Sequence, residues 1–561
     1  MADNTFDAIV IGSGITGGWA AKELCEKGLK TLVLERGRNV EHVKDYPTTS
    51  TPPWEFAHRG IDTLKIKEEY PIQSTNYAFS EDTHHFFVND RENPYTTPKD
   101  QPFRWIRGYQ VGGRSLIWGR QCYRWSDLDF EANLKDGVEI DWPIRYKDLA
   151  PWYDYVEKFI GVSGQPEELP QLPDGAFQPP MEMNCVEQHV KKAIEKNWNN
   201  RKLTIARAAN LTQPLPGRTA CRYRNLCQRG CPYGAYFSSN SSTIPAAMNT
   251  GNLTLQPHAI VESVIYDEQQ GKATGVRVIN AEDNTTTEYY GKLIFLCAST
   301  LGTTWLLLHS TSSRFPNGLG NDSGVVGHYL MDHHKEIFSQ ATIEGFDDKY
   351  YNGFRPTGIY VPRFRNVKDK HPDFLRGYGV QGGASREGWG RGVSQKGFGA
   401  DFKKALTRPG PWKMTFAAYG ETLPYYENKA ELNPNVVDKW GLPTLTLSAR
   451  FRENEYAMRK DMAQTGAEML EAAGGKEIQS IDGADIPGFA VHEMGTARMG
   501  NNPKKSVLNR WNQMHTVPNV FITDGSAMVS AACQNPSLTY MALTARAVDY
   551  AVGELKKQNI T

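Results

Sequence analysis

Apolar and polar positions divide the first 35 residues into two strands and a helix. An apolar run over 7–11 ends at the glycine turn Gly12-x-Gly14-x-x-Gly17. A helical stretch covers 19–27, and a second apolar run covers 31–35. Short apolar runs bounded by turn residues are typical of buried strands. The pattern therefore predicts a strand–helix–strand unit at the start of the sequence.

Later segments alternate strands with helices. An amphipathic helix is predicted over 148–161, because Trp152, Tyr155, Val156 and Phe159 recur on one face. Strands are predicted at 253–256, 260–266, 273–280 and 292–297, and a helix at 303–309. Short strands and aromatic loops over 335–485 indicate a substrate-facing domain, and nucleotide-binding elements return near 520–525. We therefore expect one domain to interrupt another.

Composition narrows the class of protein. Hydrophobic residues make up 39% of the chain, which suits a packed core, and 63 basic residues balance 63 acidic ones. This balance argues against a broad nucleic-acid-binding or acidic-membrane surface. The sequence has no apolar run long enough to span a bilayer and no basic segment followed by an apolar leader. We therefore expect no membrane span and no export signal of the chain's own.

The glycine turn has the features of a dinucleotide site. Gly12 suits a tight turn, Gly14 lets the backbone approach a pyrophosphate, and Gly17 lets the helix pack on the strand. Glu35, at the end of the second strand, can accept hydrogen bonds from ribose hydroxyls. The alternative is an ordinary strand–helix–strand unit. The turn does not by itself separate FAD from NAD, although Glu35-Arg36-Gly37 resembles an ending common in FAD-binding folds.

Three of the eight cysteines are clustered. Cys221, Cys227 and Cys231 lie within eleven residues, and Pro232 follows the last of them. Cysteines in a loop that ends in Cys-Pro resemble iron–sulfur ligands. Zinc with a fourth ligand from elsewhere, or a disulfide with a free thiol, are the alternatives. The cluster favours an iron–sulfur site over either of them.

Several motifs, in order, resemble the glucose–methanol–choline (GMC) flavoprotein oxidoreductases over essentially the whole length. They are the glycine turn with Glu35, 111–119 (VGGRSLIWG), 141–150 (DWPIRYKDLA), 297–302 (CASTLG), 492–500 (HEMGTARMG), 519–525 (NVFITDG) and Asn535-Pro536. One departure is Thr303-Thr304, which replaces the usual Ser-Pro of the second family signature. The sequence is thus identified as a member of this family.

The resemblance implies an α/β fold with FAD as cofactor. A Rossmann-like FAD-binding domain is expected from 1–45, 105–125, 200–330 and 486–561, with an iron–sulfur loop at 218–236. An α+β substrate-binding domain with an antiparallel sheet, together with cofactor-covering loops, is expected from 46–104, 126–199 and 331–485. The expected FAD contacts are Gly12, Gly14, Gly17, Glu35, Arg36, Gly112, Gly113, Ser115, Val261, Ala298, Asp524, Gly525 and Pro536.

The family pairs a histidine with a second histidine or an asparagine about 43 residues later, and His492 and Asn535 have this spacing. A neutral imidazole suits removal of an alcohol proton while hydride passes to flavin N5. Asn535 can donate to the developing alkoxide. The alternative is a structural His492. Ile117 occupies the position where some relatives attach FAD to a histidine, so we expect noncovalent FAD. Trp118 resembles the tryptophan of the pyranose-oxidase-like branch, which implies a sugar-like substrate.

The cysteine spacing also occurs in bacterial sugar dehydrogenases of this family, where it holds a [3Fe–4S] cluster. The resemblance implies electron transfer to a protein acceptor, such as a cytochrome, and a small subunit that supplies an export signal. The protein would then be cytoplasmic, or periplasmic by co-export. We expect oxidation of a sugar or glucoside, at C3 by preference, and glucose C1 dehydrogenase or an oxygen-using oxidase as alternatives. Gln381 and Glu421 could bind sugar hydroxyls or be ordinary polar residues.

Two other classes of function stay open. The same fold supports hydroxynitrile lyases, in which FAD is redox-silent. The chain could also be an electron-transfer subunit whose flavin is reduced by a partner protein. Direct flavin reduction by a sugar would exclude both.

Overall fold

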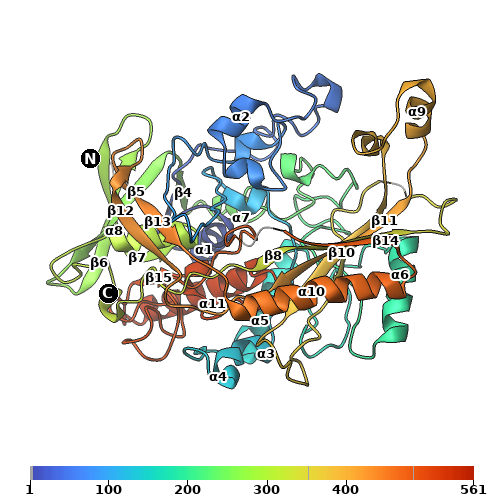
Figure 1. Cartoon of the computed structure of the whole chain (residues 1–561). Helices are drawn as coiled ribbons and strands as arrows, with labels where there is room; N and C mark the ends of the chain where they lie inside the picture. The colour runs from blue at the N-terminus through green and yellow to red at the C-terminus, as the bar shows by residue number, and fades with distance from the viewer. Residues whose placement is uncertain (1–3, 352, 484–485, 561) are drawn as a thin grey trace.

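The computed structural model describes residues 4–351, 353–483 and 486–560, and its first sheet is built from both ends of the chain (Figure 1). The strand order is β4 (Leu253–Gln256), β2 (Thr31–Leu34), β1 (Thr5–Ile11), β7 (Thr286–Leu296), β6 (Lys272–Asn280) and β5 (Ala259–Asp267), and β15 (Val520–Ile522) also pairs with β7. β4, β2, β1, β7 and β15 are parallel, whereas β5 and β6 are antiparallel additions. Helix α1 (Ile15–Glu26) contacts α11 (Ser537–Lys556), and α11 contacts α5 (Tyr146–Ile160). This arrangement confirms the expected Rossmann-like domain assembled from discontinuous segments.

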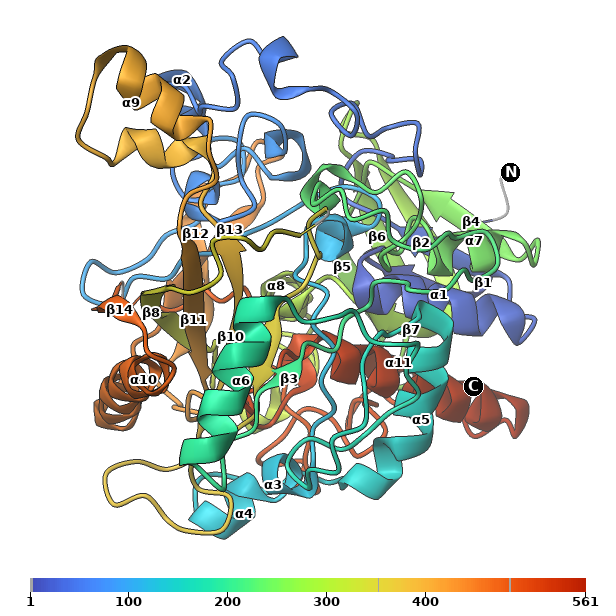
Figure 2. The ribbon, with the colours of Figure 1, turned by 90° about the vertical axis from the view of Figure 1, so that its right-hand side faces the viewer.

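The second sheet is antiparallel throughout. Its order is β14 (Lys476–Asp482), β8 (His334–Ile343), β11 (Trp412–Gly420), β10 (Tyr378–Arg386), β9 (Ile359–Val361) and β3 (Thr204–Ile205). Helices α10 (Glu453–Ala472) and α6 (Cys185–Asn197) pack on the strands of this sheet; α10 runs along it in Figure 1, and α6 lies beside β10 in Figure 2. Strands and helices together confirm the α/β class.

The remaining elements are short connections. The helices among them are α2 (Leu64–Glu69), α3 (Asp127–Phe130), α4 (Ala132–Asp136), α7 (Thr243–Met248), α8 (Thr300–His309) and α9 (Gly399–Leu406). Strands β12 (Lys429–Val437) and β13 (Pro443–Ser448) form a separate hairpin. No helix within the described ranges combines the length and the apolar character that a bilayer crossing needs.

Three segments depart from the expected domain boundaries. β3 falls in the expected FAD-binding stretch 200–330 but pairs with β9 of the second sheet. α5 falls in the expected substrate-binding stretch 126–199, yet Tyr153 and Val156 are buried in the core under α11. The β12–β13 hairpin contacts α8 of the first domain. Each segment packs against the domain that buries its apolar side chains. The order of segments along the chain does not reveal which domain that is.

The first glycine turn has the conformation and the close helix packing that the sequence predicts. Gly12 has φ +94°, a left-handed conformation that favours glycine. A Cβ on Gly17 would lie 1.9 Å from the carbonyl oxygen of Gly12. Helix α1 can therefore approach β1 only because residue 17 has no side chain.

We expect Gly17→Ala to destabilise the protein, because the added methyl group overlaps backbone that cannot move without separating α1 from the sheet. The cost should be about 2 kcal/mol or more in the free energy of unfolding by urea. Gly553→Ala is the matched control, because a Cβ at Gly553 in α11 meets no atom within 4 Å. The control should stabilise the protein by up to about 1 kcal/mol. Equal effects of the two substitutions would contradict this view of the turn.

Candidate active site

A cavity of about 810 Å³ lies between the two sheets. Gly12, Glu35 and Val261 line it from the first domain. Gln381 of β10 and Tyr419 of β11 line it from the antiparallel sheet. A volume at the upper end of the usual range for ligand pockets suits a large cofactor with a small substrate beside it.

The cofactor half of the cavity suits an anionic dinucleotide. A Cβ at Gly14 would meet no atom within 4 Å, so the backbone there is open to a ligand. Gly14 begins α1 without a side-chain cap, and the first turn has no acidic residue. The N–H groups and positive dipole end of α1 are therefore available to phosphates.

Glu35 is anchored beside this helix end. Its Oε2 accepts hydrogen bonds from the backbone N–H of Ser13 at 3.1 Å and from the Ser13 hydroxyl at 2.5 Å. Its Oε1 accepts from the backbone N–H of Gly37 at 3.0 Å. Because Glu35 also lines the cavity, its remaining lone pairs can accept ribose hydroxyls. The open glycine backbone, the helix end and this carboxylate fit FAD.

The structure brings most of the expected flavin residues to the cavity. Those that line it are Gly12, Gly14, Glu35, Arg36, Gly113, Ser115, Val261, Ala298, Asp524, Gly525 and Pro536, and Ile117 and Trp118 line it too. Gly17 and Gly112 do not line it. A Cβ at Gly112 would lie 1.7 Å from Oδ1 of Asn240, and its N–H donates to Ser13 Oγ at 3.0 Å. Gly112 thus joins two loops instead of facing the cavity.

His492, Asn535 and Gln381 meet in the cavity wall. Nδ2 of Asn535 lies 3.3 Å from Nε2 of His492. Nε2 of Gln381 donates to Oδ1 of Asn535 at 2.7 Å. Gln381 thereby fixes the orientation of the Asn535 amide, so that its NH₂ group points at the imidazole.

His333 was not predicted from the sequence, and it determines the state of His492. Burial lowers the pKa of His333 to about 4, so its ring is neutral. Its Nε2 lies 2.9 Å from the carbonyl oxygen of Ala532, an acceptor, so Nε2 must carry the proton. Its Nδ1 then accepts the 2.7 Å hydrogen bond from Nδ1–H of His492. With these tautomers Nε2 of His492 is unprotonated, and its lone pair accepts the 3.3 Å hydrogen bond from Nδ2 of Asn535 at the cavity wall, where a substrate hydroxyl can take the place of the amide.

The electrostatic surroundings keep His492 neutral. Burial lowers its pKa well below the ordinary value, and the neighbouring His333 and the cations Lys335 and Arg114 act in the same direction. Asp332 accepts the backbone N–H groups of His492 and Ala490, each at 2.9 Å. Burial, together with the charge of Glu493, raises the pKa of Asp332 to about 7. The signal that could have found this pair is the polar run 332–336 (DHHKE), which interrupts the apolar residues on either side of it.

A second contact that the sequence did not predict connects the motif 111–119, here called the flavin loop because it holds the expected FAD contacts Gly112, Gly113 and Ser115, to the motif 492–500. Arg114, in the expected flavin loop, forms two hydrogen bonds with the carboxylate of Glu493, at 3.0 and 2.9 Å. Arg114 also donates to Ser299 Oγ at 2.7 Å. A bidentate pair of this kind, with a buried carboxylate and a half-buried guanidinium, fixes the loop relative to the residue that follows His492.

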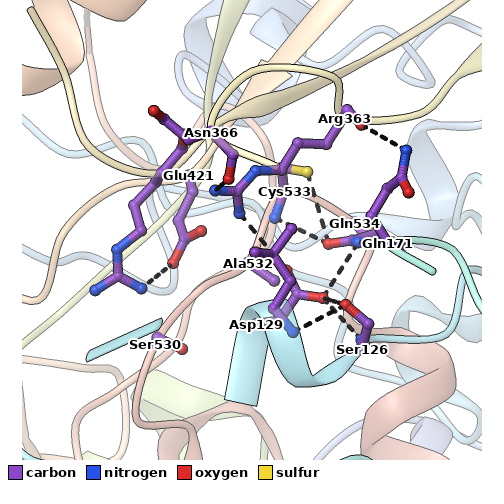
Figure 3. A network of polar contacts seen from close by, with 12 residues as sticks. Ser126, Asp129, Gln171, Arg363, Asn366, Glu421, Ser530, Ala532, Cys533 and Gln534 are labelled. Atoms are coloured by element: carbon purple, nitrogen blue, oxygen red, sulfur yellow. Dashed lines mark hydrogen bonds and ion pairs between the residues drawn. The ribbon is translucent and has the colours of Figure 1, made fainter. Parts of the chain in front are cut away.

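Glu421 does not line the cavity. Figure 3 shows it in a polar network with Arg363, Cys533 and Gln534, and its side chain is fully buried. Oε1 of Glu421 accepts a hydrogen bond from Arg376 at 3.1 Å, and both side chains are fully buried. In the same network, the side chain of Gln534 donates to Asp129 at 3.4 Å. The placement of Glu421 therefore favours a structural role over contact with a sugar.

The clustered cysteines line one small pocket. Cys221, Cys227 and Cys231 are free, half-buried thiols around a space of about 20 Å³. Asn225 belongs to the wall of this pocket and also to the wall of the large cavity. Among the described residues, no group of three or more His, Cys, Asp or Glu side chains is arranged to hold a metal ion.

Known proteins resemble this chain over nearly its whole length. It is 30% identical to 2-methyl-1,2-propanediol dehydrogenase of Mycolicibacterium austroafricanum, with 98% of this chain and 95% of that one covered. It is 26% identical to the fructose dehydrogenase large subunit of Gluconobacter japonicus, with 98% of each covered. It is 25% identical to the gluconate 2-dehydrogenase flavoprotein of Pantoea cypripedii, over 96% of this chain and 92% of that one.

Solved structures share the fold at lower identity. A formate oxidase from Aspergillus oryzae RIB40 superposes with a TM-score of 0.61 at 14% identity, covering 99% of each chain. The family model named GMC oxidoreductase matches residues 6–335 with its N-terminal part and 424–544 with its C-terminal part. The chain belongs to the GMC oxidoreductase family and is an FAD-dependent oxidoreductase that acts on CH–OH groups.

Proposed function

We propose that the protein is a dehydrogenase that oxidises a hydroxyl group of a sugar or glucoside, with C3 as the preferred carbon. The observation that carries this proposal is the unprotonated Nε2 of His492, which faces the cavity beside the amide of Asn535. Bound FAD supplies the hydride acceptor. Oxidation at C1 of glucose is the second candidate, and relatives named for fructose and gluconate support a sugar-type substrate generally.

The geometry gives each side chain a separate task. A substrate O–H placed between the two groups donates to His492 Nε2, which takes the proton as the C–H leaves as hydride. The NH₂ group of Asn535 donates to the same oxygen and stabilises its developing negative charge. Gln381 prevents the Asn535 amide from turning its oxygen toward the alkoxide.

Other polar residues of the cavity lining suit a substrate with several hydroxyl groups. Gln121, Thr357 and Tyr419 line the cavity and can donate to or accept from hydroxyls. Ile117 cannot form a covalent bond to the flavin, which supports noncovalent FAD. An oxygen-using oxidase stays the alternative if the cysteine site holds no cluster.

We further propose that Cys221, Cys227 and Cys231 hold a [3Fe–4S] cluster, which would supply one-electron transfer. The support for this assignment is the cysteine spacing, together with the lining of one pocket by three free cysteines; as they stand, the three thiols do not form a group arranged to hold a metal ion. The backbone N–H of Tyr223 donates to Cys221 Sγ at 3.4 Å. Asn225 lines both this pocket and the large cavity, and this adjacency supports electron transfer between the two. A cytochrome-type acceptor and a small partner subunit fit this role, and one relative is named a large subunit.

His492→Ala should retain FAD but reduce the flavin more slowly by a factor on the order of 10² to 10⁴, because the base that takes the hydroxyl proton is gone. Anaerobic stopped-flow bleaching of the flavin by glucose and methyl glucoside measures this rate. His58→Ala is the control, since His58 is exposed and does not line the cavity. Near-normal bleaching in His492→Ala would remove this histidine from the mechanism. No bleaching of the unmodified protein by either compound would contradict the proposed sugar dehydrogenase.

Cys227→Ser should remove about three irons per chain and leave FAD bound. Single-turnover bleaching should persist, whereas turnover with a protein acceptor should collapse, because the one-electron exit is lost. Cys185→Ser, a half-buried cysteine outside the loop, should change neither iron content nor turnover. Iron analysis and electron paramagnetic resonance provide the readout. Zinc or no metal in the unmodified protein would return the three cysteines to a structural role.

A further inference from the structure

Five cationic side chains line the large cavity, and they differ in whether a carboxylate neutralises them. Arg36 pairs with Asp438 at 2.8 Å, Arg107 with Asp90 at 3.4 Å and Arg114 with Glu493 at 2.9 Å; the two other cations are Arg120 and Lys335. Neither of these two has a carboxylate within 4.0 Å among the described residues. Glu336 and Asp332 act on Lys335 electrostatically without contacting it, so a ligand that brings a carboxylate to the ammonium group gains a charge pair there.

Lys335 stands at the start of β8, where the sheet is irregular. The pairing of β8 with β11 shifts register between Ala418 and Gly420, and Glu336 has φ +75°. Bulges of this kind redirect side chains next to active sites. Lys335 lines the cavity, whereas Glu336 does not and packs its Cβ near Gly483.

Three aromatic rings surround the Lys335 ammonium group. Its Nζ lies 4.7 Å from the ring centre of Phe489, 5.4 Å from that of Tyr77 and 5.9 Å from that of Tyr419. Within the described ranges, Nζ has no hydrogen-bond acceptor. Three ring faces attract a cation but leave its N–H donors unused.

Arg120 is the second uncompensated cation. Its side chain is buried, and two of its nitrogens donate to the carbonyl oxygens of Trp118 and Pro356, at 2.7 and 3.4 Å. Its Nε is buried without a hydrogen-bond partner. Tyr77 experiences the positive charge of both Arg120 and Lys335, which places the two cations around the same part of the cavity.

We propose that Lys335, assisted by Arg120, recognises a carboxylate on the substrate, so that the preferred substrates are sugar acids. This inference rests on the proposed function and narrows its substrate class. The substrate hydroxyl would lose its proton to His492 and its C–H hydrogen as hydride, while the carboxylate stays chemically unchanged. Lys335 belongs to β8 of the antiparallel sheet, whereas the helix end that suits the cofactor phosphates belongs to α1 of the Rossmann-like domain.

The test compares glucuronate with glucose, which differ at one carbon. Lys335→Met should lower the ratio of kcat/KM for glucuronate to that for glucose at least about tenfold, because a charge pair inside the cavity is lost. Lys335→Arg should recover part of the ratio. Lys413→Met is the control, since Lys413 lies on the same sheet outside the cavity and donates to Thr342. The control should leave the ratio unchanged.

Binding gives an independent readout. Calorimetry of glucuronate with photoreduced holoprotein, which cannot oxidise it, should show a matching loss of affinity in Lys335→Met. An unchanged ratio with a lowered melting temperature would overturn the proposal and leave Lys335 a structural cation. Loss of bound FAD in Lys335→Met would overturn it too, by assigning the cation to the cofactor. If glucose and methyl glucoside bleach the flavin but Lys335→Met leaves the kcat/KM ratio of glucuronate to glucose unchanged, the proposed function stands and this inference fails.

Discussion

The attachment of His492 to Asp332 and His333 is the constraint on which the site depends. Asp332 accepts the backbone N–H groups on either side of Val491, and His333 accepts from the His492 ring. One contact fixes where the residue sits, and the other fixes which nitrogen carries the proton. Without both, an imidazole at this position would be free to flip or to change tautomer, and its lone pair would not consistently face the substrate.

These contacts lie where separate parts of the chain meet. Residues 332–333 precede β8 of the antiparallel sheet, whereas 492–493 and 535 belong to the C-terminal segment that returns to the Rossmann-like domain. Arg114 and Glu493 add a third connection, from the flavin loop. Polar contacts therefore fix the position of the substrate-binding half of the site relative to the cofactor-binding half. These contacts tolerate little displacement, because each lost partner leaves a polar group without a hydrogen bond.

The sequence predicted the first sheet and the cofactor half of the site well, because local patterns define them. The strand predictions at 253–256, 260–266 and 273–280 correspond to β4, β5 and β6, and the glycine spacing located the turn at Gly12. Helix α10 was missed because Glu455, Arg459 and Gly466 occur among its buried positions and blur the apolar stripe. His333 and the ion pair of Glu421 were missed because each depends on a partner far away in sequence.

The pH dependence of flavin reduction tests the central claim, that His492 is held as a neutral base. A base whose pKa lies well below the ordinary 6.5 stays unprotonated as the pH falls through that value, and protonation of Asp332 near pH 7 lowers the tendency of His492 to protonate still further. At saturating glucose, the anaerobic bleaching rate should therefore stay within about twofold between about pH 8 and about pH 5.5. A rate that falls about tenfold per pH unit below about 6.5 would show an ordinary imidazole and contradict the account.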